Sequence, residues 1–255
     1  MPLSSPGHGA EVAPSAMITG ATGGIGRAIA GRLAHAGYRL TLSGRDEAAL
    51  AKLASDLDDG GAELHIVPAD MATEDDISAL ARGHSGRFGS MDLLVLCAGT
   101  GTSGRIADYP MRRFDRQMTV NVRAPFALVQ ECLPALRRAA AARPAHGSRI
   151  AAIASMAGIA SEPGLAAYGA AKAALISLCQ CINAEESSVG VSATAIAPGY
   201  VDTEMSAWVH DRIDPAEMIP PADIAELVLA LAQLSARSVV PLIAMSRAGE
   251  THWQA

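Results

Sequence analysis

A tyrosine and a lysine lie four residues apart in an alanine-rich run of this sequence, at Tyr168 and Lys172. In a helix, the two side chains emerge on the same face. A phenol has an ordinary pKa of about 10, and an ammonium about 4 Å away in a shielded cleft favours the phenolate by roughly 4 kcal/mol. The pair could therefore supply a phenol that exchanges a proton with a carbonyl oxygen near neutral pH.

The alternative is a partly buried tyrosine beside a lysine that reaches past it to solvent. The chain contains 18 arginines but only two lysines, Lys52 and Lys172. Because arginine supplies nearly every other positive charge, the compact ammonium at position 172 favours a specific role.

Three glycines, Gly20, Gly24 and Gly26, form the pattern G-x-x-x-G-x-G between an apolar run and a helical pattern. Glycines at such a turn let the backbone approach a pyrophosphate, which then faces the amide groups at the start of the helix. The alternative is a tight strand-to-helix turn that binds nothing. No Gly-Lys-Ser/Thr follows, which excludes a nucleoside-triphosphatase loop.

The end of the next apolar run, Ser43-Gly44-Arg45, bears on the choice of dinucleotide. A carboxylate there would bind a ribose 2′-hydroxyl, whereas Gly44 leaves space for a 2′-phosphate that Arg45 could pair with. The alternative uses Asp46 or Glu47 as the ribose ligand, although acids in the first turn of a helix also favour the helix dipole. The pattern predicts NADP(H) in preference to NAD(H), which stays possible.

Short apolar runs alternate with helix-length amphipathic segments, a pattern typical of an α/β protein with a parallel, doubly wound sheet. We expect about seven strands, at residues 15–19, 39–43, 63–69, 92–98, 149–154, 191–197 and 239–245. We expect helices on both faces, over residues 26–37, 47–57, 74–84, 114–142, 166–187 and 223–235. No boundary divides the chain, so we predict a flexible tail at residues 1–14 and one domain over 15–255.

Composition argues against several other functions. The chain of 255 residues is 50% hydrophobic with a formal net charge of -6. It has no basic run interleaved with aromatic residues, which disfavours nucleic-acid binding; Arg112, Arg113 and Arg116 are expected to form a solvated helix face. The histidines and the four cysteines show no metal-ligand or disulfide spacing, so we expect no metal and a cytoplasmic location. No run of about 18 apolar residues predicts a membrane span.

Several motifs occur together in a characteristic order: TGATGGIG (19–26), Asp70, the AG of LCAG (96–99), Asn121 in VNV, Ser155 in IASMAG, YGAAK (168–172) and PGYVDT (198–203). In this order, and with Ser155 thirteen residues before Tyr168, they resemble the short-chain dehydrogenase/reductase family over about residues 14–235. The resemblance implies a single-domain Rossmann fold and an oxidoreductase that acts on CH–OH or C=O groups.

The resemblance also implies roles for individual residues. Tyr168 would be the acid/base, Lys172 would lower its pKa and bind the nicotinamide ribose, and Ser155 would hydrogen-bond the substrate oxygen. Asn121 would hold a water that links Lys172 to solvent, and Asp70 would bind the adenine. Cofactor contacts are implied at Gly20, Thr22, Gly24, Ile25, Gly26, Ser43, Arg45, Asp70, Met71, Ala98, Gly99, Tyr168, Lys172, Pro198, Gly199, Val201 and Thr203.

Plainer roles exist for two of these residues, and the chain departs from the family in two places. Asn121 could be a polar residue at a helix kink near Pro125, and Ser155 a turn serine.

Where the family commonly has Asn-Asn-Ala-Gly, this chain has Leu-Cys-Ala-Gly at residues 96–99, so an asparagine that braces the sheet is missing. The C-terminal strand lacks the usual glycine-rich ending.

The sequence therefore predicts an NADP(H)-dependent carbonyl reductase or alcohol dehydrogenase acting on a ketone or secondary alcohol. The alternative is a non-catalytic dinucleotide-binding sensor or scaffold on the same fold. Residues 206–221 are expected to cover the active site, where Trp208 and Met218 indicate an apolar or mixed pocket. The apolar face of the helix carrying Tyr168 is expected to meet a second copy of the chain, giving a homodimer or homotetramer.

Overall fold

Seven apolar segments form one parallel sheet with the order β3-β2-β1-β4-β5-β6-β7. The computed structural model describes residues 12–58 and 61–249, so residues 1–11 of the expected tail lie outside the described part. The strands are β1 (Ser15–Thr19), β2 (Arg39–Ser43), β3 (Leu64–Ile66), β4 (Leu93–Leu96), β5 (Ser148–Ile153), β6 (Val191–Pro198) and β7 (Leu242–Met245). The predicted doubly wound α/β fold is confirmed.

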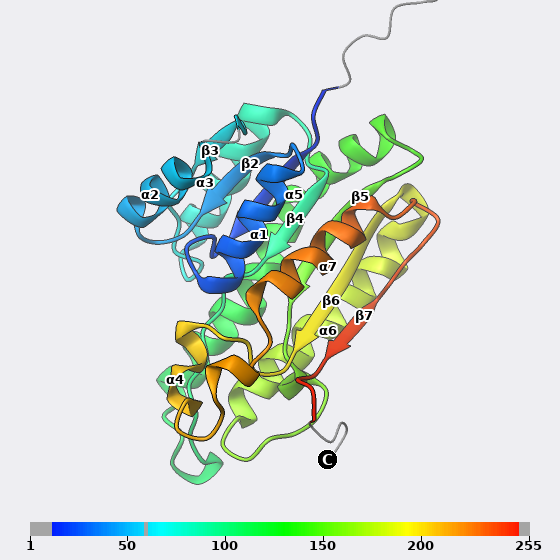
Figure 1. The fold of residues 1–255 in the computed structure, drawn as a ribbon. Helices are drawn as coiled ribbons and strands as arrows, with labels where there is room; N and C mark the ends of the chain where they lie inside the picture. The colour runs from blue at the N-terminus through cyan, green and yellow to red at the C-terminus, as the bar shows by residue number, and fades with distance from the viewer. Residues whose placement is uncertain (1–11, 59–60, 250–255) are drawn as a thin grey trace, which may run out of the picture.

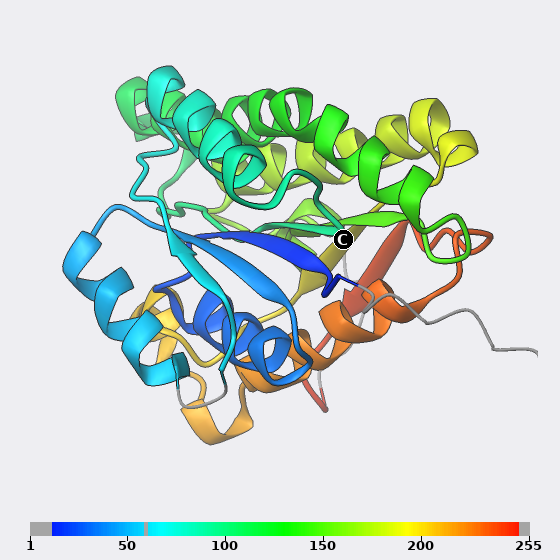
Figure 2. The ribbon, with the colours of Figure 1, turned by 90° about the horizontal axis from the view of Figure 1, so that it is seen from above.

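Helices cover both faces of this sheet (Figure 2). One layer contains α1 (Gly24–His35), α2 (Glu47–Leu57) and α7 (Pro221–Gln233), and the other contains α3 (Glu74–Phe88), α5 (Ala124–Ala142) and α6 (Ala166–Glu186). The short α4 (Met111–Met118) lies beyond the carboxyl ends of the strands (Figure 1). None of the helices within residues 12–58 and 61–249 is long and apolar enough to cross a membrane.

The central strands are apolar on both faces because each face is covered by helices. On β1, Met17 packs into the core under α3, α5 and α6, whereas Ala16 and Ile18 pack under α1 and α7. All three side chains are fully buried. The alternation follows from the two-residue period of a strand, and it produces one core on each side of the sheet.

Three strands are shorter than expected. Strand β4 ends at Leu96 rather than residue 98, and a proline lies beside each of the other two. Strand β3 ends at Ile66 rather than residue 69, and β7 begins at Leu242 rather than residue 239. Pro68 and Pro241 cannot donate a backbone hydrogen bond, which limits ladder pairing where they stand.

The segment expected as one helix over residues 114–142 is interrupted. Helix α4 begins earlier, at Met111, and residues Thr119–Arg123 form a π turn before α5. The backbone N–H of Ala124 donates to the carbonyl of Thr119, a bond one residue longer than in an α-helix. Pro125 follows at once and has no N–H to return the chain to α spacing there. The expectation of a continuous helix was therefore wrong.

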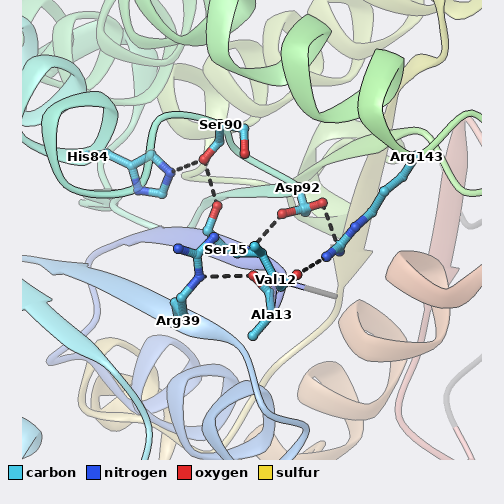
Figure 3. Close-up of polar contacts among 8 residues, drawn as sticks. All are labelled: Val12, Ala13, Ser15, Arg39, His84, Ser90, Asp92 and Arg143. Carbon is cyan, nitrogen blue, oxygen red and sulfur yellow. Dashed lines mark hydrogen bonds and ion pairs between the residues drawn. The ribbon is translucent and has the colours of Figure 1, made fainter. Parts of the chain in front are cut away.

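The amino ends of the strands are joined by a polar network, shown in Figure 3. The Asp92 carboxylate accepts a hydrogen bond from the backbone N–H of Ser15 at 2.7 Å and pairs with the Arg143 guanidinium at 3.1 Å. The Ser15 hydroxyl and the His84 ring both bond to the carbonyl of Ser90. These contacts attach the start of β1 to the edge of the sheet opposite the carboxyl ends.

Candidate active site

The glycine turn after β1 lies at the point where the sheet order reverses between β1 and β4, where ligands of such sheets bind. Gly20 has a positive φ of 65°, and a Cβ there would lie 2.9 Å from the Ala98 backbone after β4. A Cβ at Gly26 would lie 2.1 Å from the Gly20 carbonyl oxygen. The glycines are therefore required by the close packing of this turn.

A cavity of about 380 Å³ opens over this turn. Twelve of the residues implied as cofactor contacts line it: Gly20, Thr22, Gly24, Ile25, Gly26, Ser43, Arg45, Asp70, Met71, Ala98, Gly99 and Thr203. The Ser43 hydroxyl is buried and has no hydrogen-bond partner among the described residues. The exposed Arg45 guanidinium forms no hydrogen bond or ion pair within that same part of the chain. An unsatisfied hydroxyl, an unpaired guanidinium and a glycine turn suit a phosphorylated dinucleotide.

Two acids near this cavity already have local partners. Asp46 caps α2, because its carboxylate accepts the backbone N–H of Ala49 at 3.0 Å. Asp70 lines the cavity while its carboxylate accepts the backbone N–H of Ala72 at 2.9 Å. The cap gives Asp46 a structural role.

A second cavity of about 580 Å³ adjoins the first, since six residues line both: Ile25, Cys97, Gly99, Thr100, Thr203 and Met205. Ser155 follows β5, Tyr168 and Lys172 lie on α6, and all three line the larger cavity. Pro198 at the end of β6, and Gly199 and Val201 after it, line the cavity too. The fold thus brings together the end of β5, the helix α6 and the end of β6.

Tyr168 and Ser155 line the same cavity. Burial raises the pKa of the Tyr168 phenol above its ordinary value, and the nearby Ser155 hydroxyl opposes this rise. The Ser155 hydroxyl also accepts the backbone N–H of Ala157 at 3.2 Å, so the serine is both a turn residue and a neighbour of the phenol.

The expectation that Lys172 lowers the pKa of Tyr168 was wrong for this geometry. The Lys172 ammonium lies over the phenol ring, 5.6 Å from its centroid, and donates to the Ile153 carbonyl at 2.7 Å. The lysine is 5% exposed, and burial lowers its pKa to about 8. The ammonium is thus directed at a backbone carbonyl, while burial governs the phenol.

Asn121 lines neither cavity but lies behind Gly99 in the π turn. Its amide donates to the Thr100 carbonyl at 2.7 Å and accepts the Thr100 N–H at 3.1 Å. A Cβ on Gly99 would come within 3.0 Å of Asn121 Oδ1 and 3.5 Å of Lys172 Nζ. The Asn121 side chain therefore faces the loop after β4, and Gly99 of that loop lies between Asn121 and Lys172.

The missing sheet-bracing asparagine has a local replacement in Thr19. Its hydroxyl accepts the backbone N–H groups of Cys97 and Ala98, both at 3.1 Å, and donates to the Val95 carbonyl at 3.2 Å. Thr19 is buried, so these bonds satisfy backbone groups that would otherwise lie unpaired.

Arg113 and Arg116 are exposed, as expected, but Arg113 also lines the larger cavity and Arg116 the smaller one. The two residues are three apart on α4, so they share a helix face. The sequence spacing gives that face but does not show that it meets the two cavities. Trp208 lines the larger cavity as expected, but Met218 is buried outside it.

A family model for the short chain dehydrogenase matches residues 14–213. The chain belongs to the short-chain dehydrogenase family. This short-chain dehydrogenase is 33% identical over 191 residues to an uncharacterized oxidoreductase of Staphylococcus epidermidis, with 75% of this chain and 79% of the relative covered. Membership makes the chain an oxidoreductase that acts on CH–OH and C=O groups with a nicotinamide dinucleotide.

Two solved structures are similar to this short-chain dehydrogenase over nearly its whole length. An alcohol dehydrogenase from the archaeon Thermococcus sibiricus, complexed with 5-hydroxy-NADP, has a TM-score of 0.84 and 26% identity, covering 95% of this chain and 99% of that one. The Pseudomonas aeruginosa RhlG/NADP active-site complex has a TM-score of 0.83 and 29% identity, covering 92% and 95%.

Proposed function

We propose that this chain is an NADP(H)-dependent carbonyl reductase or alcohol dehydrogenase that interconverts a ketone and a secondary alcohol. One observation carries the proposal: Ser155 and Tyr168 line a cavity that adjoins the glycine-turn cavity. A proton donor for a substrate oxygen is therefore next to the proposed dinucleotide site.

The proposed reaction needs one hydride and one proton. A reduced nicotinamide dinucleotide, held by the residues that line the glycine-turn cavity, would supply the hydride. Tyr168 donates its phenolic proton to the carbonyl oxygen as the C–O bond becomes single, and Ser155 orients that oxygen by a hydrogen bond. In the oxidative direction, Tyr168 takes the proton back.

Lys172 and Asn121 serve this step indirectly in the proposal. Lys172 lines the cavity beside Tyr168 and would bind the nicotinamide ribose hydroxyls. Asn121 holds the loop after β4 through Thr100 and keeps the region beside Lys172 open. The proton then returns from solvent past these two residues.

The cofactor preference rests on Arg45. Its guanidinium lines the glycine-turn cavity without an intramolecular partner in the described residues, and Asp46 is engaged as a helix cap. Both solved relatives named above were captured with NADP or its derivative. We therefore propose a 2′-phosphate contact at Arg45 and a preference for NADP(H).

A homodimer or homotetramer is part of the proposal. Helix α6 exposes a row of small side chains, Ala166, Ala170, Ala173 and Ser177. Phe126 on the neighbouring α5 is 58% exposed. A second copy could approach such a flat surface closely and cover the phenylalanine.

Replacing Tyr168 by Phe tests the function. We expect turnover of ketones with NADPH to fall by at least about a hundred-fold, since general acid catalysis contributes that much, while NADPH affinity by nicotinamide fluorescence stays nearly unchanged. Full turnover in Tyr168→Phe would overturn the assignment of Tyr168. If the unmodified protein binds NADPH but reduces no carbonyl compound, the sensor alternative replaces the proposal.

A further inference from the structure

Arg113 differs from its two neighbouring arginines in where it lies. It lines the larger cavity, Arg116 lines the smaller one, and Arg112 lines neither. All three are exposed residues of α4. Positions 112 and 113 are about 100° apart around the helix, so their side chains leave it in different directions. The helix thus presents one guanidinium to the cavity that contains Tyr168.

This guanidinium has no partner of its own. Within the described residues, Arg113 forms no side-chain hydrogen bond and no ion pair. The other charged groups of the cavity are engaged: Glu162 accepts a hydrogen bond from the Tyr200 hydroxyl at 2.6 Å, and Lys172 donates to the Ile153 carbonyl. Arg113 is therefore the one cation among the described residues of the cavity wall that has no intramolecular partner.

Much of the remaining wall is apolar. Met156, Leu165, Met205 and Trp208 line the cavity, and the rings of Tyr200 and Trp208 meet edge to face with centroids 6.2 Å apart. An apolar wall accepts hydrocarbon or aromatic groups, while a single guanidinium at its edge fits a planar anion with two oxygens. The complementary ligand has an apolar body and a carboxylate.

We propose that the substrate is a keto acid with an apolar or aromatic body, whose carboxylate binds Arg113 while its carbonyl oxygen lies at Ser155 and Tyr168. This inference rests on the proposed carbonyl reductase function and narrows its substrate class. Arg113 acts as a specificity residue: it binds the part of the substrate that does not react. Removing a charge-assisted hydrogen bond of this kind costs about ten-fold to a hundred-fold in binding.

Matched probes separate the carboxylate from the carbonyl. 3-Benzoylpropionate and 4-benzoylbutyrate carry an aromatic ketone and a carboxylate at two spacings, and their methyl esters keep the ketone without the charge. Turnover of each is followed with NADPH, and binding of each to the Tyr168→Phe protein with NADPH is measured by calorimetry. We expect at least one acid to have a KM and a Kd about ten-fold or more below those of its ester.

Variants assign that preference to Arg113. Arg113→Gln should remove the preference for the acid over the ester, Arg113→Lys should retain part of it, and Arg112→Gln should leave it unchanged. Circular dichroism confirms that each variant is folded. The inference is overturned if no acid binds better than its ester, or if Arg113→Gln leaves the preference intact. Acid binding that depends on Arg113 without reduction of either ketone supports the carboxylate contact at Arg113 and counts against the reductase function on which the substrate assignment rests.

Discussion

At the residue scale, Arg45 and Asp46 are adjacent, but only Arg45 lines the glycine-turn cavity. The Arg45 guanidinium lines the cavity and has no partner among the described residues, whereas the Asp46 carboxylate bonds to the backbone of α2. A phosphate gains from the first group, and a ribose hydroxyl would have to compete for the second. The two residues therefore give separate predictions.

Replacing Arg45 by Ser should weaken NADPH binding by about ten-fold or more while NADH binding changes little, because only NADPH has a 2′-phosphate. Asp46→Asn is the matched control, since asparagine also caps helices well and should leave both affinities nearly unchanged. Parallel fluorescence titrations with the two nucleotides measure both effects. A selective loss of NADH binding in Asp46→Asn would show that Asp46 is a ribose ligand and would count against NADP(H) preference.

At the element scale, the start of α1 is set by one close approach. The Gly26 Cα lies where any side chain would collide with the Gly20 carbonyl at 2.1 Å. Gly31, in the middle of the same helix, has ordinary space, and a Cβ there would meet only Leu57 at 3.9 Å. Position therefore decides whether a glycine of α1 is required.

Gly26→Ala should destabilise the fold by about 1–3 kcal/mol, the usual cost of overpacking, and should weaken NADPH binding because the turn must open. Gly31→Ala should stabilise it by about 0.5–1 kcal/mol, since alanine is the better helix residue. Urea denaturation of both variants measures the free energies of unfolding. A Gly26→Ala protein with unchanged stability and NADPH affinity would contradict the steric argument.

At the scale of the whole molecule, His84 links α3 to the amino edge of the sheet (Figure 3). The ring is fully buried between the Thr41 hydroxyl at 2.8 Å and the Ser90 carbonyl at 3.1 Å. Burial lowers the pKa of His84 to about 4. The folded protein thus keeps this imidazole neutral at pH values where the unfolded chain protonates it.

The free energy of unfolding should therefore fall as the pH is lowered from about 6.5 to about 4, because the unfolded state binds the proton and the folded state does not. The contribution of His84 over that range is on the order of 3 kcal/mol. Urea denaturation at pH 7.5 and pH 5 measures about 2 kcal/mol of it, because pH 5 is still above the folded pKa of about 4. His84→Gln, which cannot titrate, should lose less stability between the two pH values; an identical loss in both proteins would refute the role of His84.

Local pattern in the sequence was enough for the order of strands and helices and for the position of the glycine turn after β1. Strand and helix periods repeat within a few residues, and Gly20, Ser155, Tyr168 and Lys172 stand at the ends or on the faces of those elements. Because parallel strands place their carboxyl ends at one edge, the order of motifs also indicated that these residues gather there.

Tertiary structure alone decided which groups face each other across that edge. Arg113 enters the larger cavity, Thr19 braces the strand after which Cys97 stands, and Lys172 points at Ile153 rather than at the phenol oxygen. Each of these contacts joins segments apart in sequence, and burial in the folded chain raises the pKa of Tyr168. Periodicity reports which face of an element is buried, whereas the partner on that face depends on how distant elements pack.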